Sequence, residues 1–133
     1  MNFEKYIDIP YKYKGRSFEG ADCWGLIWLM FKEEKDIILP DDLTYKEFWY
    51  KNYDKNHLLN GIGSFNDKII VNQFNIFDTL LFYNKSRTFV DHIGLLVEEG
   101  KFIHTYRNSN SKIDRLEGYW NSRLYKGVRY CQK

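Results

Sequence analysis

Cysteine is scarce in this sequence, with Cys23 and Cys131 as the only two among 133 residues. Two cysteines cannot build the multiply bridged scaffold of a small secreted domain, and no C-x-x-C pair suggests a zinc site. The two stand in very different local contexts, so a disulfide between them is not the favoured interpretation. We therefore treat both as thiols.

Long apolar runs and an excess of one charge are also missing. The longest apolar stretch, 26–31, is far too short to span a membrane. The first ten residues lack the apolar core of a secretory signal, which predicts a chain kept in the cytoplasm unless other machinery exports it or lysis releases it. A formal net charge of +2 gives no electrostatic argument for nucleic acid. We expect neither a membrane nor a nucleic-acid partner.

Aromatic residues, by contrast, are abundant at 19% of the chain, with 11 Tyr, 10 Phe and 4 Trp. Many must be buried, and tyrosine hydroxyls suit polar clefts. The length is that of one domain with one core. Because no repeat, low-complexity tract or linker interrupts it, we predict a single domain over 1–133.

The clearest helical pattern starts after Asp22, a good N-cap, and must stop before Pro40. Its apolar residues have the spacing of a helix with one buried face: Cys23, Leu26, Ile27, Met30 and Phe31. A second, more polar helical pattern covers 44–60. Residues 1–20 are predicted to form an entry loop with a short helix at its start.

The second half of the chain carries strand signals. They fall at 68–71, 79–83, 92–97, 102–106 and 128–131. The EEGK segment at 98–101 predicts a tight hairpin turn, and 107–121 a loop with one helical turn. Helices followed by consecutive antiparallel strands indicate the α+β class, with the helices packed on one face of the sheet.

Cys23 is the first candidate for chemistry. Unpaired amides and the positive end of the helix dipole at a helix start favour a thiolate, which is a nucleophile at neutral pH. The same amides could stabilise an oxyanion. A buried structural cysteine on the inner face of the helix is the alternative.

The histidines supply candidates for a base. His92 opens one predicted strand and His104 lies near the end of the next, so period-2 alternation can bring both to the same side of the sheet. A histidine held by a second histidine is oriented as a triad requires. Two ordinary strand histidines are the alternative. His57 lies among polar residues and is interpreted as solvated surface.

Three segments together resemble the NlpC/P60 family. The first, PYKYKGRSFEGADCWGL, resembles the nucleophile region, with Tyr11, Gly15, Gly20, Asp22, Cys23, Gly25 and Leu26 on the family positions and Pro40 further on. FNIFDTLLFYN places Asp78 on the family aspartate. DHIGLLVEEGKFIHTY resembles the histidine hairpin, with matches at His92, Gly94, Gly100 and His104.

The resemblance implies a papain-like fold and a Cys–His–His triad that hydrolyses amide bonds in peptidoglycan stem peptides without metal or cofactor. Cys23 would be the nucleophile, His92 the base and His104 its orienting partner. The Cys23 amide and the Tyr11 hydroxyl would stabilise the oxyanion, and Asp22 would lie in the same substrate region. Asp78 is expected to be structural. The segment GRSFEGADCWGL resembles the bacteriophage branch of the family, whose members associate with tail proteins.

Two departures from the family pattern lie near its substrate-amine subsite. Trp24 replaces a serine common after the cysteine, and Lys14 replaces the first glycine of a pair. Other functions stay open. They are a catalytically silent component of a phage tail tip, a papain-like amidase or acyltransferase acting on another substrate, and an aromatic-rich binding domain for wall or glycan.

Overall fold

The computed structural model describes residues 2–39, 68–71 and 73–130. The predicted helix at 44–60, His57, Pro40 and Cys131 lie outside these residues. The elements run in the order η1 (Glu4–Tyr6), β1 (Arg16–Ser17), β2 (Gly20–Ala21), α1 (Cys23–Lys35), β3 (Lys68–Val71), β4 (Thr79–Tyr83), β5 (Val90–Glu98), β6 (Lys101–His104), β7 (Lys112–Arg115), α4 (Tyr119–Arg123) and β8 (Leu124–Tyr130).

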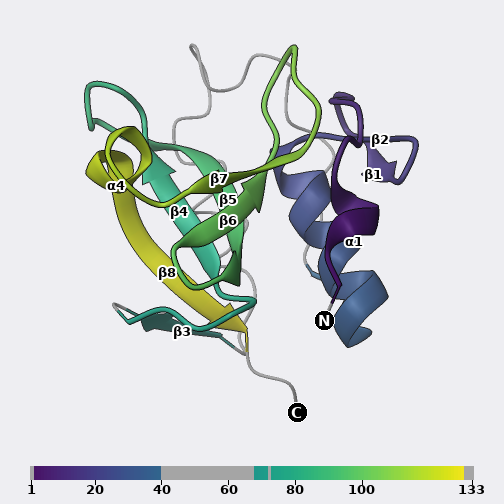
Figure 1. Cartoon of the computed structure of the whole chain (residues 1–133), viewed down its shortest axis with the longest axis horizontal. Helices are drawn as coiled ribbons and strands as arrows, with labels where there is room; N and C mark the ends of the chain where they lie inside the picture. The colour runs from purple at the N-terminus through teal and green to yellow at the C-terminus, as the bar shows by residue number, and fades with distance from the viewer. Residues whose placement is uncertain (1, 40–67, 72, 131–133) are drawn as a thin grey trace.

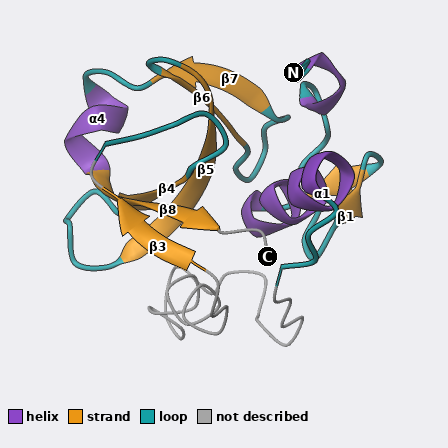
Figure 2. Ribbon diagram, turned by 90° about the horizontal axis from the view of Figure 1, so that it is seen from below, coloured by secondary structure: helices purple, strands orange, loops and turns teal. Residues whose placement is uncertain are grey.

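A curved antiparallel sheet forms the centre of the described structure. Its strand order is β3-β8-β4-β5-β6-β7, and each strand is antiparallel to its neighbours. In Figures 1 and 2, α1 lies on one side of this sheet and α4 at its opposite end. The prediction of an α+β fold with the cysteine helix packed on an antiparallel sheet is confirmed.

Both the start and the end of α1 follow the prediction. The Asp22 Oδ1 atom accepts a hydrogen bond of 2.8 Å from the amide of Gly25, as an N-cap should. The helix stops because Asp36 adopts a left-handed conformation, with φ of 54°, and the Ile37 amide donates back to the Phe31 carbonyl. The helix therefore stops before Pro40, at the start of the DIILP segment, as the sequence predicts.

Both faces of the sheet are covered, by two separate groups of side chains. The larger group joins α1 to the sheet through Leu26, Ile27 and Met30 on the helix and Leu81, Ile93, Leu95 and Ile103 on the strands. The smaller group consists of Leu80, Phe82, Leu96 and Phe102, with Trp120 of α4 packed against it. Trp24 and Leu29 are also buried, so α1 buries more than the single face that its apolar spacing predicted.

The strand predictions differ from the structure mainly after residue 104. β3 and β4 have the predicted bounds, β5 and β8 are longer, and β6 ends at His104 instead of continuing to 106. The segment 107–121 contains β7 as well as the start of α4, which is the expected helical turn. β7 was missed because three of its four residues, KIDR, are charged and all lie half-buried or exposed at the edge of the sheet.

Candidate active site

Cys23 is the first residue of α1, and the segment before it holds the helix start in place. The Asp22 carboxylate is buried and accepts from the Arg16 guanidinium at 2.8 Å and from the Lys14 amide at 3.1 Å, in addition to Gly25. These bonds stay within residues 14–25. The position of the Cys23 backbone is therefore set by local hydrogen bonds.

Gly25 is required by the close approach of this segment to the helix. A Cβ atom there would lie 1.9 Å from the Gly15 carbonyl oxygen and 2.7 Å from Arg16 Nη1. No side chain fits between a helix and a backbone at that distance. The glycine two residues after the cysteine is thus explained by packing beside the thiol.

The two histidines meet on the sheet. His92 Nε2 lies 2.7 Å from His104 Nδ1, and His104 Nε2 lies 2.7 Å from Asp114 Oδ2 on β7. His92 pairs with Phe82 across the sheet, and residues two apart along β5 and β6 share this face. The expectation that both imidazoles point to the same side is confirmed.

Aromatic side chains enclose this imidazole pair. The Trp120 ring stacks on His92 at a centroid distance of 5.1 Å and meets His104 edge-on at 4.7 Å. Phe102 lies 4.5 Å from His104, and Phe82 lies 5.7 Å from His92. His104 is fully buried and His92 nearly so. Solvent is therefore largely excluded from the bond between the two rings.

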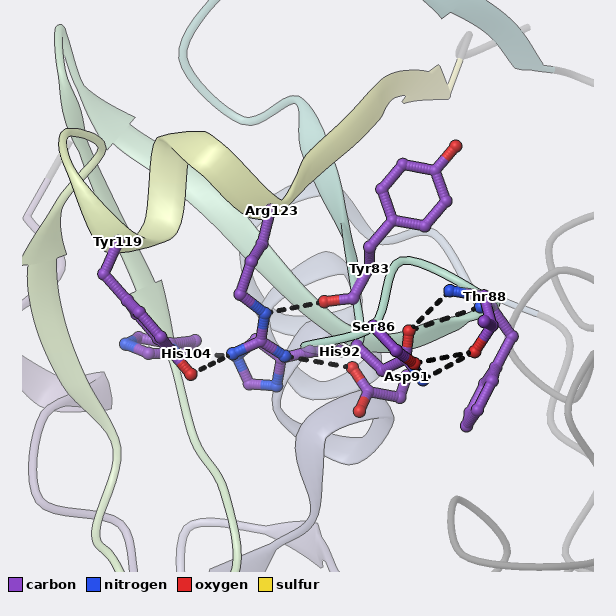
Figure 3. Close-up of polar contacts among 10 residues, drawn as sticks. Tyr83, Ser86, Thr88, Asp91, His92, His104, Tyr119 and Arg123 are labelled. Carbon is purple, nitrogen blue, oxygen red and sulfur yellow. Dashed lines mark hydrogen bonds and ion pairs between the residues drawn. The ribbon is translucent and has the colours of Figure 1, made fainter.

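Cys23 and His92 line one cavity of about 380 Å³. Its other lining residues are Tyr11, Asp91, Tyr106, Arg107, Tyr119, Trp120 and Arg123. Figure 3 shows Arg123 extending from α4 with contacts to Tyr119, Tyr83 and Asp91. Its Nε atom donates to the Tyr83 carbonyl at 2.7 Å, and Nη2 lies 3.3 Å from Asp91 Oδ1. The short helix α4 thus forms one wall of the cavity and is tied to the sheet by one arginine.

The thiol and the imidazoles come from different layers of the molecule. α1 packs on the face that carries Ile93 and Leu95, whereas His92 contacts Phe82 and Trp120 on the face covered by α4. The register shifts between Phe82 and Tyr83 of β4, so that Asp91 forms a bulge in β5. The cavity opens beside this irregular end of the strand, and there both layers contribute side chains.

Protonation in the unliganded site differs from the sequence expectation. Burial raises the pKa of the Cys23 thiol, and the Asp22 carboxylate raises it further, although the Trp24 amide and Arg16 act in the opposite direction. Burial also lowers the pKa of His92 well below its usual value, and lowers that of His104 to about 4 against the opposing effect of Asp114. Burial and Asp22 thus oppose the low pKa that the helix start was expected to give the Cys23 thiol, and burial favours the neutral imidazole of His92.

The structure separates the residues expected in the substrate region. Tyr11 lines the cavity with Cys23, whereas Asp22 is occupied as the helix cap and Trp24 is buried in the core beneath α1. Asp78 accepts from Nε and Nη2 of Arg129, each at 2.8 Å, and from the Asn75 amide at 2.7 Å. Its predicted structural role is confirmed.

Sequence reasoning did not find the wall formed by α4 or the carboxylate behind His104. Asp91 stands directly before His92 and Asp114 lies ten residues after His104, but neither spacing predicts a contact without the strand register. Trp120 was passed over as part of the predicted loop at 107–121, and Arg123 just beyond that loop was given no role. Their i, i+3 spacing beside a helical turn was the available signal.

Within residues 2–39, 68–71 and 73–130, no group of three or more His, Cys, Asp or Glu side chains is arranged to hold a metal ion. No helix in the same ranges is long and apolar enough to cross a bilayer.

A nucleophile-type cysteine at a helix start and a paired imidazole in one cavity define the arrangement used by cysteine hydrolases. The family model described as "NlpC/P60 family" matches residues 8–129, and the chain belongs to this family. Members of this family are cysteine peptidases.

Curated relatives are longer than this chain. Gamma-DL-glutamyl hydrolase of Bacillus subtilis (strain 168) is 30% identical over 95% of this chain and 27% of that protein. Murein DD-endopeptidase MepH of Escherichia coli (strain K12) is 30% identical over 92% of this chain and 41% of that protein. The chain thus spans less than half the length of these two relatives. The crystal structure of the NlpC/p60 domain of the peptidoglycan hydrolase SagA shares the fold, with a TM-score of 0.63 and 19% identity over 94% of this chain and 90% of that one.

Proposed function

We propose that this domain is a cysteine peptidase that hydrolyses an amide bond in the peptide part of peptidoglycan, with Cys23, His92 and His104 as its catalytic group. The observation that carries the proposal is the shared cavity, in which Cys23 lies with an imidazole that is hydrogen-bonded at 2.7 Å to a second imidazole. Family membership and the name of one relative, a murein DD-endopeptidase, support the substrate class.

The proposed reaction begins with transfer of the Cys23 proton to His92. The His92 Nε2 atom is already bonded to His104, so Nδ1 is the atom that accepts the proton. The sulfur attacks the amide carbonyl and forms a C–S bond. His92 then gives the proton to the leaving nitrogen as the C–N bond breaks. Water, deprotonated by His92, hydrolyses the thioester and restores the thiol.

The negative charge on the carbonyl oxygen needs donors at the helix start. Asp22 already occupies two amides of the first turn, since its side chain accepts from Gly25 and its carbonyl accepts from Leu26 at 2.9 Å. The amide of Cys23 itself is the proposed donor, and the hydroxyl of Tyr11 is the second because Tyr11 lines the cavity.

Purified peptidoglycan provides the direct test. The wild-type domain should release fragments whose new amino and carboxyl termini, identified by mass spectrometry, lie on either side of one amide bond. Cys23→Ala should release none while keeping the same thermal unfolding temperature. Equal release by wild type and Cys23→Ala, or no release by folded wild type on several wall types, would overturn the proposal.

The finer assignment is that the domain acts as part of a bacteriophage tail. Two sequence similarities support it: the segment 15–26 resembles the phage members of the family, and the segment 116–130 loosely resembles the end of such phage domains. Immunogold labelling of phage particles from a host that carries the gene tests it. Labelling at the tail tip supports the assignment, and unlabelled tails on otherwise labelled cells refute it.

A further inference from the structure

The hydrogen-bond chain that starts at His92 does not end at His104. The Asp114 carboxylate, on the neighbouring strand β7, lies 2.7 Å from His104 Nε2. In the register of β6 and β7, Phe102 is opposite Asp114 and His104 is opposite Lys112, so Asp114 and His104 are diagonal neighbours on one face of the sheet. Three side chains from three adjacent strands thus form one continuous chain of bonds.

The direction of every proton in this chain follows from its last member. An ionised carboxylate only accepts, so His104 must carry its proton on Nε2 and donate it to Asp114. The Nδ1 atom of a neutral His104 then has a lone pair and accepts from His92 Nε2–H. His92 in turn is left with an unprotonated Nδ1. Both histidines are therefore Nε2–H tautomers.

We propose that Asp114 is a positioning residue that fixes these two tautomers and thereby leaves His92 Nδ1 ready to accept the Cys23 proton. The proposal rests on the function given above, in which His92 is the base. The opposite tautomer of His104 would donate from Nδ1 to His92 Nε2 and leave the His92 proton on Nδ1. A His92 in that state has no lone pair towards the cavity and cannot act as the base.

The burial of His104 explains why a carboxylate is needed to fix its tautomer. His104 is fully buried and enclosed by Phe102 and Trp120, so solvent has little access to replace the carboxylate as acceptor. The Asp114 side chain is 33% exposed, so the chain of hydrogen bonds reaches solvent only at its last member. Its charge also acts through His104 when His92 becomes an imidazolium during the reaction. Asp114 does not line the cavity, so it is not expected to touch the substrate.

The tautomers can be observed without any substrate. In ¹⁵N-labelled protein, long-range ¹H–¹⁵N correlation spectra distinguish Nδ1 from Nε2 and show which of them is protonated. We expect both His92 and His104 to be Nε2–H tautomers in the wild type at pH 7. An Nδ1–H signal for either histidine overturns the proposal, whatever the domain does to peptidoglycan.

Variants of Asp114 link the tautomer to the reactivity of Cys23. Asp114→Asn can accept or donate at nearly the same place, so His104 should become a mixture of tautomers. We expect kcat to fall about 10- to 100-fold with little change in KM, and Asp114→Glu to recover most of the loss. The rate of alkylation of Cys23 by iodoacetamide, measured in a Cys131→Ser background, should fall in parallel and needs no peptidoglycan.

A matched control removes another carboxylate from the same sheet. Glu98→Gln deletes an exposed charge whose partner is Lys101, at 3.5 Å, and should leave the tautomers, kcat and alkylation rate unchanged. A folded Asp114→Asn that keeps wild-type tautomers and alkylation would overturn the proposal. If the Asn variant does not fold, the wild-type tautomers and the Glu variant decide the question. Loss of wall cleavage with the expected tautomers would instead count against the proposed substrate.

Discussion

The cysteine side and the histidine side of the cavity are built in different ways. Around Cys23, one carboxylate satisfies the helix start through Gly25, Arg16 and Lys14, all within twelve residues of sequence. Around His92, the chain of bonds joins β5, β6 and β7, and α4 covers it with Trp120. Local bonds thus place the nucleophile, whereas strand register and long-range packing place the base. A substitution on one side of the cavity should therefore leave the structure of the other side unchanged.

Removal of His92 should produce the largest effect. His92→Ala deletes the proposed base, and kcat/KM for wall peptides should fall about 10³-fold. Because the hydrogen bonds of Asp22 that hold the helix start lie within residues 14–25, α1 should keep its structure, visible as unchanged amide signals for residues 22–26 in NMR spectra. His57→Ala is the control, and we expect it to cost little. A greater loss in the His57 variant would mean that the base is misassigned.

Gly25→Ala tests the cysteine side alone. Its Cβ would meet the Gly15 carbonyl, so the variant should lose about 3 kcal/mol of unfolding free energy in urea and move the thiol. The histidine ring signals should stay at their wild-type shifts in the folded fraction. Gly20→Ala is the matched control, since its Cβ would meet the side chain of Lys12 and not a carbonyl oxygen, and should cost less. Equal losses in the two variants would contradict this account of Gly25.

Acid should weaken the histidine side first. The folded pKa of His104 is lowered from 6.5 to about 4, so in this window the unfolded chain binds a proton that the folded chain does not. Its contribution to stability is complete above pH 6.5 and is lost as pH falls, by about 2 kcal/mol between pH 8 and pH 5. Urea titrations at several pH values measure this slope. The slope should flatten in His104→Gln, and an equal slope in both proteins would show that other groups cause it.

Loss of the Trp120 ring, with which α4 covers His92, should have the smallest effect on activity. Trp120→Leu admits water beside His92, so the pKa of His92 should rise towards its usual value. Because the proposed base must be neutral, the acid limb of kcat/KM should shift to higher pH, with about a 10-fold loss near pH 5.5 and little loss at neutrality. Phe18→Leu, which changes an exposed ring stacked on Tyr6, is the control and should leave the profile unchanged. An unshifted limb in Trp120→Leu would mean that the tryptophan does not set the pKa of His92.

The same contrast explains what the sequence could predict. The bounds of β3 and β4 and the capped start of α1 follow from patterns within a few residues, and the pairing of His92 with His104 follows from one short hairpin. Asp114 and Trp120 lie beyond that hairpin, in a polar edge strand and a five-residue helix with weak local signals. The thiol pKa also could not be predicted, because it depends on how deeply a folded cavity buries the sulfur.

The position of β7 at the outer edge of the described sheet has a further consequence. This strand is four residues long and pairs only with β6 among the described strands. Short edge strands of this kind unfold locally at a lower free-energy cost than the central strands of the sheet. An opening of this kind would carry Asp114 away from His104 while the core under α1 stayed folded. Catalytic activity would then be lost at a lower denaturant concentration than the one that unfolds the core. Faster amide exchange at 112–115 would mark the concentration at which activity is lost.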